Sequence, residues 1–320
     1  MTVIDTRTRR FLHKILSYAA LPAGRLHQTL NLKDLTGSDD FGTGIVFIVG
    51  APRTGTTLFY QILTNMLNVG YLSNLSNLFY HSLLSGMMLH ERIFGARPHN
   101  NFSSDNGRTK GWNSVNESGK FWYQWYPKDI CCLTDEMLSK IDFSPMVNTI
   151  RNIQYSLKKP LVFKNQTNSQ RVSSLARLFP DSIFVHVVRA PLPTVKSIIR
   201  QRRRFLGSVD KWYSIKPDNY EQIKGLDYVE QVVQQIYGVD RMIQGALDDL
   251  DEERWIRVRY EDLCKFWQDS VHKVKNRLEL FSPVHERQGA RTPKIKTHGI
   301  ADDDGAEVRA IAKKVMQIYG

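Results

Sequence analysis

The sequence predicts an α/β fold: a single domain built around a parallel sheet with helices on both of its faces. Two observations support this prediction. Short runs of β-branched and aromatic residues alternate along the chain with longer segments of helical periodicity, an order typical of parallel sheets. In addition, 42% of the 320 residues are hydrophobic and 24% are charged, an ordinary balance that leaves enough apolar surface for a large core.

The first strand is predicted at residues 45–49, where the run IVFIV ends at Gly50. Apolar residues at helical spacing from Leu58 to Leu67 predict the helix that follows. The same alternation then continues along the chain. It predicts strands at 161–163, 183–188 and 255–258, and helices over 194–204, from 228 toward 250 and from 263 onward.

Residues 1–40 are predicted to form a helical N-terminal extension, and residues 41–320 the main domain. Between residues 95 and 129 the chain is rich in Asn, Ser, Gly and aromatic residues, which predicts an insertion that folds over the site. Within the extension, residues 7–19 combine basic and apolar residues at helical spacing. This segment either forms a helix that packs on the body of the protein or makes peripheral contact with a membrane.

Membrane insertion and a disulfide framework find no support in the sequence. No apolar run reaches the roughly 20 residues of a membrane-spanning helix, and the start lacks the features of a secretory signal. The three cysteines, Cys131, Cys132 and Cys264, are odd in number and two are adjacent, which favours a reducing compartment. We therefore expect a cytoplasmic protein.

The net charge of +12, from 44 Lys and Arg against 32 Asp and Glu, favours an anionic partner. Nucleotides, nucleic acids, acidic glycans and membrane surfaces all satisfy that condition. Charge alone therefore does not choose among them.

The segment Gly50–Thr57, GAPRTGTT, has the glycine spacing of a phosphate-binding P-loop and stands between a predicted strand and a predicted helix. Its glycines allow a tight turn whose N–H groups face one anion together with the positive end of the helix dipole. Arg53 adds a cation to this turn, and Thr56 and Thr57 add hydroxyl donors. The expected fold is therefore a P-loop-type parallel sheet.

The segment lacks the lysine that normally follows the second glycine, and the neighbouring predicted strands end in Lys164 and Arg189 rather than in a metal-binding acid. A phosphate cradle with several cations suits an anionic donor whose departing charge is neutralised by side chains. No metal is expected. The pattern weakens the alternative of a P-loop nucleotide kinase or ATPase without removing it.

On these residues the sequence resembles the sulfotransferases that use 3′-phosphoadenosine 5′-phosphosulfate (PAPS), in particular the branch whose loop reads Pro-Arg-Ser-Gly-Thr-Thr; here Thr54 replaces the serine. The resemblance implies that PAPS is the donor, that 3′,5′-ADP is released, and that the acceptor is a hydroxyl of a carbohydrate, lipid or small molecule. In that family an arginine at a strand end and a serine eight positions later hold the 3′-phosphate, roles that fall on Arg189 and Ser197. The implied donor site comprises Pro52, Arg53, Thr54, Gly55, Thr56, Thr57, Arg189 and Ser197.

Arg53 and Lys164 are the candidates to stabilise the charge that builds where the donor is cleaved. Lys164 resembles the catalytic lysine of the tyrosylprotein branch, but Asn165 and Gln166 replace the residues that follow it there. In that branch a glutamate about twenty positions beyond the loop arginine is the base. Asn74 stands at that distance here, and an amide does not accept a proton, so the base must lie elsewhere.

Glu117, within the insertion, is the first candidate for the general base, and His81 is the second. A solvated loop carboxylate and a packed histidine are the plainer interpretations of these two residues. The aromatic residues of the insertion either stack on a sugar, an aromatic acceptor or adenine, or they pack in the core. The cluster comprises Trp112, Trp122, Trp125 and Tyr126. The string RYEDL at Arg259–Leu263, which many relatives carry, favours a role in helix start and packing.

The basic run 200–204 either widens the field around the 3′-phosphate, contacts an acidic glycan or is solvated. The basic residues of 291–296 resemble in composition the C-terminal loop that some sulfotransferases place over the donor. A second class of function also remains open, that of a non-catalytic protein that binds acidic glycans or nucleic acid through its charge and aromatic residues. The resemblance favours the enzyme, for which we expect no nucleic-acid partner.

Overall fold

The structure is a computed structural model that describes residues 44–128, 130, 133–293, 295 and 305–319. The predicted N-terminal extension, with residues 7–19, lies outside the described residues, as do Cys131 and Cys132. Cys264 is a free cysteine. The domain boundaries and the reducing compartment therefore stay predictions.

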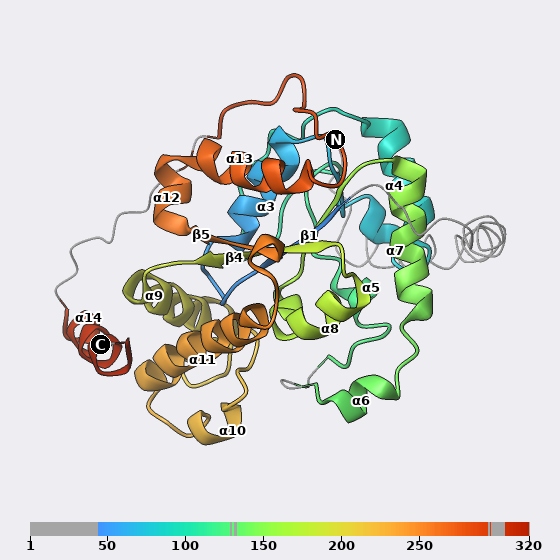
Figure 1. Ribbon diagram of the computed structural model, residues 1–320. Coiled ribbons are helices and arrows are strands. Elements are labelled where there is room, and N and C mark those ends of the chain that lie inside the picture. Colours follow the sequence, from blue (N-terminus) through green and yellow to red (C-terminus); the bar gives the residue numbers. More distant parts are fainter. Residues whose placement is uncertain (1–43, 129, 131–132, 294, 296–304, 320) are drawn as a thin grey trace.

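Five parallel strands form one sheet in the order β2-β3-β1-β4-β5. Four of the strands match the predicted ranges to within one residue at each end. β2 is an edge strand of two residues, too short to leave a periodic pattern in the sequence. The predicted parallel α/β fold is thus confirmed (Figure 1). The strands are β1 (Ile45–Val49), β2 (Gly70–Tyr71), β3 (Leu161–Lys164), β4 (Ser182–Val188) and β5 (Trp255–Arg259).

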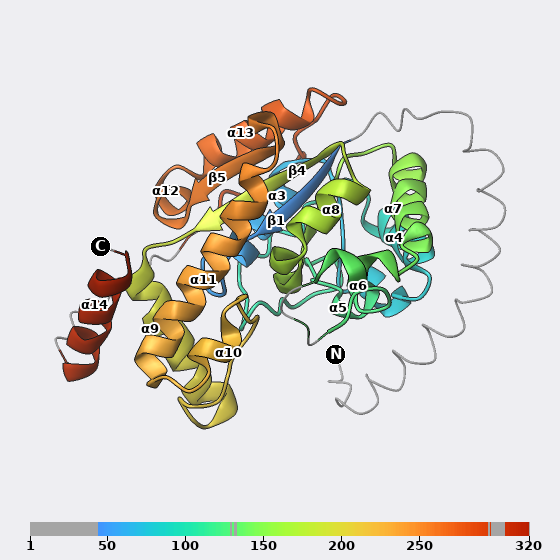
Figure 2. The same ribbon diagram turned by 60° about the horizontal axis from the view of Figure 1, so that its bottom comes forward.

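Helices cover both faces of the sheet (Figures 1 and 2). On one face lie α3 (Thr56–Met66) and α13 (Trp267–Leu278), and on the other α8 (Val172–Leu178), α9 (Pro191–Gln201) and α11 (Tyr228–Asp248). Successive side chains of a strand point to opposite faces, so β1 contributes to two separate cores. Val46 and Ile48 lie in the core with α3 and α13, whereas Ile45, Phe47 and Val49 lie in the core with α8, α9 and α11.

Two helices illustrate how local sequence sets the helix ends. α9 begins at Pro191, three residues before the predicted start, because a proline in the first helical turn lacks only an N–H group that has no helical partner there. It ends at Gln201 and continues as a wider turn over Arg202–Leu206. α11 begins after Asp227, whose side chain accepts a hydrogen bond from the Val229 amide over 2.9 Å.

The remaining helices lie around the sheet and the helices that cover it. α4 and α7 lie at the β2 edge, where a Cβ on Gly70 would contact Met87 of α4 and Leu157 of α7. The C-terminal helix α14, which the sequence analysis did not predict, packs on α9 and α11. These elements are α4 (Leu83–Phe94), α5 (Gly119–Trp122), α6 (Asp135–Ser139), α7 (Ser144–Leu157), α10 (Tyr220–Ile223), α12 (Tyr260–Lys265) and α14 (Ala306–Tyr319), with single 3-10 turns at Ser76–Phe79, Gln166–Gln170 and Glu252–Arg254.

Phe47 of β1 is expected to contribute strongly to stability, because its side chain is fully buried. Phe47→Ala should lower the free energy of unfolding by about 3–5 kcal/mol through lost burial and the cavity left behind. Urea denaturation measures this loss. The Phe47 ring contacts four other buried rings, those of Trp122, Phe163, Phe179 and Phe184.

The matched control is Phe266→Ala, because 58% of Phe266 is exposed. This variant should unfold within about 1 kcal/mol of wild type. Equal losses for the two variants would contradict the position assigned to Phe47 in the core.

Candidate active site

The segment Gly50–Thr57 forms the turn between β1 and α3. Arg53 and Gly55 have φ angles of 70° and 97°, in the region that favours glycine. The Ser169 side chain holds the start of the turn, since its Oγ accepts from the Gly50 amide and donates to the Gly50 carbonyl, each over 3.0 Å. A turn of this kind at the start of an 11-residue helix offers N–H groups and the positive end of the helix dipole to an anion.

Gly55 lies against the ring of Tyr260, the first residue of α12. A Cβ at position 55 would lie 2.3 Å from Tyr260 Cδ2. The same ring contacts the guanidinium of Arg189, with 4.3 Å between Cζ and the ring centroid. The next residue, Glu261, accepts a hydrogen bond from the Ala190 amide over 3.0 Å. The RYEDL string therefore starts a helix, as expected, and also supports the turn and Arg189, a role that the sequence analysis missed.

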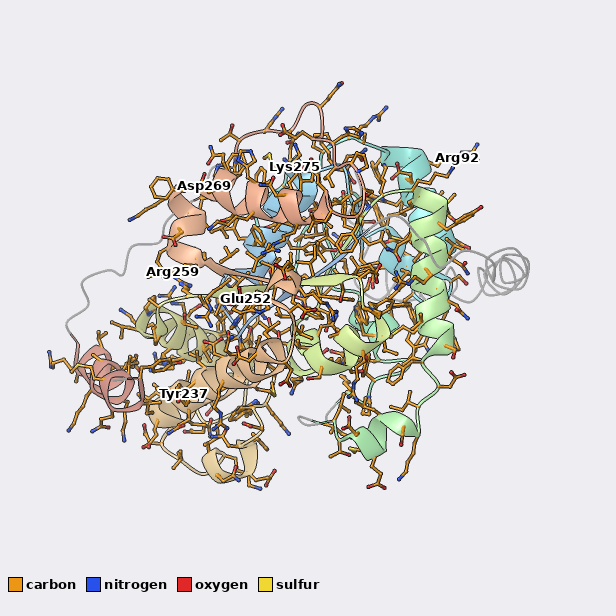
Figure 3. All side chains as sticks on the ribbon, in the orientation of Figure 1. Arg92, Tyr237, Glu252, Arg259, Asp269 and Lys275 are labelled. Atoms are coloured by element: carbon orange, nitrogen blue, oxygen red, sulfur yellow. The ribbon has the colours of Figure 1, made fainter. Side chains whose placement is uncertain are left out.

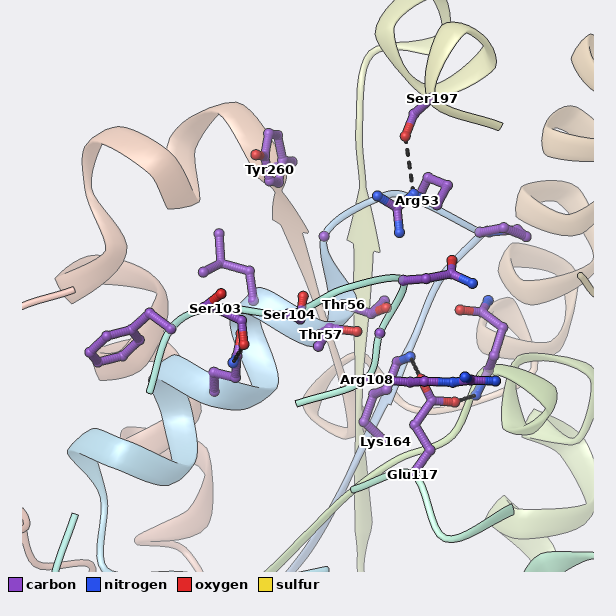
Figure 4. Close-up of a pocket in the computed structure, with 18 of the residues that line it drawn as sticks. Arg53, Thr56, Thr57, Ser103, Ser104, Arg108, Glu117, Lys164, Ser197 and Tyr260 are labelled. Carbon is purple, nitrogen blue, oxygen red and sulfur yellow. Dashed lines mark hydrogen bonds and ion pairs between the residues drawn. The ribbon is translucent and has the colours of Figure 1, made fainter. Parts of the chain in front are cut away.

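Three residues of the implied donor site meet beside the end of β4. Arg53 Nε donates to Ser197 Oγ over 3.0 Å, and Arg189 Nη1 donates to the Arg53 carbonyl over 3.2 Å. Ser197 belongs to α9 and Arg189 follows β4, so the segments after β1 and β4 converge here (Figure 4). Burial lowers the pKa of the Arg53 guanidinium below its ordinary value. The site therefore presents a partly desolvated cation to any ligand.

Lys164 and Glu117 form a second group at the end of β3. Lys164 Nζ is paired with Glu117 Oε1, and the Gln166 amide donates to Oε2 of the same carboxylate over 3.0 Å. Asn165 Nδ2 donates to the Glu117 carbonyl over 3.1 Å, and Gln166 Nε2 donates to the Gly50 carbonyl over 2.8 Å. Asn165 and Gln166 thus connect Glu117 to the strand end and to the turn Gly50–Thr57.

One cavity of about 1860 Å³ contains both groups (Figure 4). Thr54 is not part of its wall, because its hydroxyl is buried and donates to the Ala51 carbonyl over 2.9 Å. Among the described residues that line the cavity, seven are Lys or Arg and Glu117 is the one carboxylate. The candidate residues on its wall are Pro52, Arg53, Gly55, Thr56, Thr57, Glu117, Lys164, Arg189 and Ser197.

His81 is not among the residues that line this cavity. Its Nδ1 lies 3.1 Å from Gln124 Oε1, and its ring packs on Tyr80 with 4.1 Å between centroids. Asn74, at the position of the expected glutamate, is also structural. Its amide donates to the Gly111 carbonyl over 2.8 Å and its Oδ1 accepts from Asn116.

The aromatic insertion contributes mainly to the core. Phe121, Trp122 and Tyr126 are at most 1% exposed, and Trp112 is 51% exposed. Tyr123 is the member of the cluster that lines the cavity. Packing, the plainer of the two interpretations, therefore holds for most of the cluster, and the ring of Trp122 contacts Phe47 and Phe163 in the core.

The basic run 200–204 is not a uniform solvated surface. Arg200 lines the cavity, whereas Arg202 is fully buried. In the second basic segment Arg291 also lines the cavity, and Lys294 and Lys296 lie outside the described residues. The other arginines of the run are bound to polar or acidic partners: Arg202 to Gln231, Arg203 to Glu307 and Arg204 to Asp105.

Across the described ranges, no group of three or more His, Cys, Asp and Glu side chains is arranged to hold a metal ion. A search of the same ranges finds no helix with the length and apolar character needed to cross a membrane.

Gly55→Ala is expected to destabilise the protein by about 1–3 kcal/mol, since the residue combines a positive φ with the contact to Tyr260. Adding Tyr260→Ala to Gly55→Ala should remove the loss of stability caused by the contact. The loss caused by the positive φ should remain. Urea denaturation of both single variants and the double variant measures the coupling. Strictly additive losses would contradict the contact.

The sulfotransferase family model matches residues 46–282, well over half of the chain. The chain is 27% identical over 131 residues to omega-hydroxy-beta-dihydromenaquinone-9 sulfotransferase Stf3 of Mycobacterium bovis and of Mycobacterium tuberculosis, a match that covers 41% of this chain and only 31% of each relative. Among solved structures, sulfotransferase STF1 from Mycobacterium tuberculosis H37Rv aligns over 98% of this chain and 86% of its own, with 15% identity and a TM-score of 0.51. The structural likeness establishes the shared fold, and the family match establishes that this chain belongs to the sulfotransferase family.

Proposed function

We propose that this protein transfers a sulfuryl group from PAPS to a hydroxyl group of an acceptor and releases 3′,5′-ADP. The observation that carries the proposal is the composition of one cavity, in which a phosphate-binding turn meets the Arg189–Ser197 pair on one side and Lys164 with Glu117 on the other. Membership of the sulfotransferase family supports the same reaction.

The chemistry of the cavity wall fits PAPS, which when bound supplies an activated sulfuryl group. The start of α3, with the hydroxyls of Thr56 and Thr57, holds the 5′-phosphate, and Arg189 with Ser197 holds the 3′-phosphate. Arg53 serves the 3′ end in the observed conformation, because its Nε is bonded to Ser197 Oγ. The catalytic role predicted for Arg53 would require its guanidinium to turn toward the 5′ end.

Lys164 and Glu117 carry the transfer step in this proposal. The acceptor oxygen forms a bond to sulfur while the bond from sulfur to the 5′-phosphate oxygen breaks, and the electron pair of that bond leaves with the phosphate. Lys164 neutralises the charge that builds on the phosphate, and Glu117 takes the proton of the acceptor hydroxyl. Glu117 is preferred to His81 because it lines the cavity and His81 does not.

A lipid hydroxyl is the acceptor class that the relatives favour, since their name specifies an omega-hydroxy-beta-dihydromenaquinone-9. The match spans less than a third of their length, so carbohydrates and small alcohols belong in the same screen.

A screen with radiolabelled PAPS tests the proposal. Purified protein is incubated with an isoprenoid alcohol, a sugar and a phenol, each with and without EDTA. We expect label transfer to at least one acceptor and no loss of transfer in EDTA. A P-loop kinase would instead phosphorylate from ATP and lose activity in EDTA. A non-catalytic binder would leave PAPS intact and bind acidic polymers with a steep salt dependence.

Lys164→Ala and Arg189→Ala are expected to separate chemistry from donor binding. Lys164→Ala should lower kcat by about 10²–10³, the typical effect of removing one group that stabilises developing charge. Arg189→Ala should weaken 3′,5′-ADP binding by about 10- to 100-fold, as charged hydrogen bonds are lost. Steady-state kinetics and calorimetry measure the two effects. Lys140→Ala is the control, because the Lys140 side chain is 70% exposed. This variant should change neither kcat nor the affinity for 3′,5′-ADP.

Glu117→Gln is expected to lower turnover by about 10²–10⁴ through loss of the general base. The affinity for 3′,5′-ADP should stay within about twofold of wild type, because Glu117 faces the acceptor in this proposal. Glu136→Gln, at a side chain 79% exposed, is the matched control. Full turnover in Glu117→Gln would remove Glu117 from the mechanism and leave the donor assignment intact.

A further inference from the structure

Residues Asp105–Arg108 form a tight turn within the insertion. The Asp105 amide donates to the Arg108 carbonyl, and the Arg108 amide donates to the Asp105 carbonyl, each over 2.9 Å. Asn106 and Gly107, at the two central positions, have φ angles of 53° and 78°. An Asn-Gly pair with two positive φ angles is the signature of a type I′ turn. The turn therefore fixes the point at which the Arg108 side chain leaves the backbone.

The turn is held against the segment that follows α9. The carboxylate of Asp105 forms an ion pair with Arg204 over 3.1 Å. Asn106 Oδ1 accepts a hydrogen bond from the hydroxyl of Tyr213, which also lines the cavity. Contacts from two neighbouring turn residues to two different side chains restrict rotation of the turn relative to the cavity.

Gly107 brings the turn into contact with both parts of the proposed reaction centre. A Cβ at position 107 would lie 3.2 Å from Glu117 Oε1 and 3.6 Å from Thr57 Oγ1. The backbone here thus spans the short distance between the proposed base and the phosphate-binding turn. Arg108, the next residue, therefore leaves the backbone close to both Glu117 and Thr57.

The Arg108 side chain is exposed and lines the cavity. Figure 4 shows Arg108, Glu117 and Lys164 among the side chains on the wall of this cavity. Lys164 is paired with Glu117 and Arg53 is bonded to Ser197, whereas the Arg108 guanidinium has no hydrogen bond or ion pair with any described residue.

The pKa of the Tyr213 hydroxyl depends in part on the charges of Arg53 and Arg108. Burial raises its pKa, and the positive charges of Arg53 and Arg108 both act in the opposite direction. Arg108 is therefore close enough to influence a group inside the cavity.

We propose that Arg108 is a catalytic residue that binds the oxygens of the sulfuryl group during its transfer. The inference rests on the proposed function. Lys164 is assigned to the departing phosphate and Glu117 to the acceptor proton, so the sulfuryl oxygens need a separate cation. A guanidinium supplies several N–H donors in one plane, which suits an anionic group with several oxygens.

The test compares two nucleotides that differ in the sulfuryl group. PAPS carries it and 3′,5′-ADP lacks it, so Arg108→Gln should weaken PAPS binding by about tenfold and change 3′,5′-ADP binding by less than about twofold. Calorimetry with each nucleotide measures both affinities, without any acceptor. Arg108→Lys, which keeps the charge, should recover part of the PAPS affinity.

Arg92→Gln is the matched control, because Arg92 is exposed, points outward from α4 (Figure 3) and does not line the cavity. It removes the same charge and should leave both affinities unchanged. An equal loss for the two nucleotides in Arg108→Gln would make Arg108 a phosphate ligand and overturn the inference, as would no loss for either. If wild-type protein binds neither nucleotide, the proposed function itself fails and the inference fails with it.

Discussion

The arrangement of the site depends on the close approach of three chain segments at Gly50. Its carbonyl accepts hydrogen bonds from Ser169 and Gln166, both of which follow β3. A Cβ at position 50 would lie 2.5 Å from the carbonyl oxygen of Val187 in β4. Because β1 pairs with β3 on one side and β4 on the other, only a residue without a side chain lets the three segments meet so closely. The residues that follow the three strands therefore reach a single cavity.

The central strands and the helices between them could be predicted, because strands and helices differ in the spacing of their apolar residues. Every residue of β1 is buried, which gives the continuous apolar run expected of a strand covered on both faces. β2, with two residues, is too short for such a signal. α14 does carry apolar residues at helical spacing, Val308, Ile311, Val315 and Ile318, a signal that the sequence analysis did not use. The early start of α9 reflects Pro191, whose fixed φ suits the first turn of a helix.

The site was predictable where its residues belong to local motifs. The turn Gly50–Thr57 and the Arg189–Ser197 spacing belong to strand-to-helix connections, so their positions in the fold could be predicted from the sequence. Tyr260 supports that turn from more than two hundred positions away, and no local pattern assigns it that role. The Asn106–Gly107 pair does indicate a turn, but only the folded chain places the turn against Glu117.

The positions of the charged side chains in the structure indicate a candidate base, which the net charge alone does not. Several arginines are structural: Arg202 is fully buried, and Arg287 donates to backbone carbonyls from a buried position. The cavity, by contrast, gathers seven basic residues around one carboxylate among the described residues of its wall, and no histidine lines it. Lysine and arginine side chains have no acceptor for a proton while they are charged, and amides and hydroxyls accept one poorly. In the proposed reaction Glu117 is thus the side chain of this wall best suited to take the acceptor's proton. That inference depends on which residues line the cavity and not on any motif around position 117.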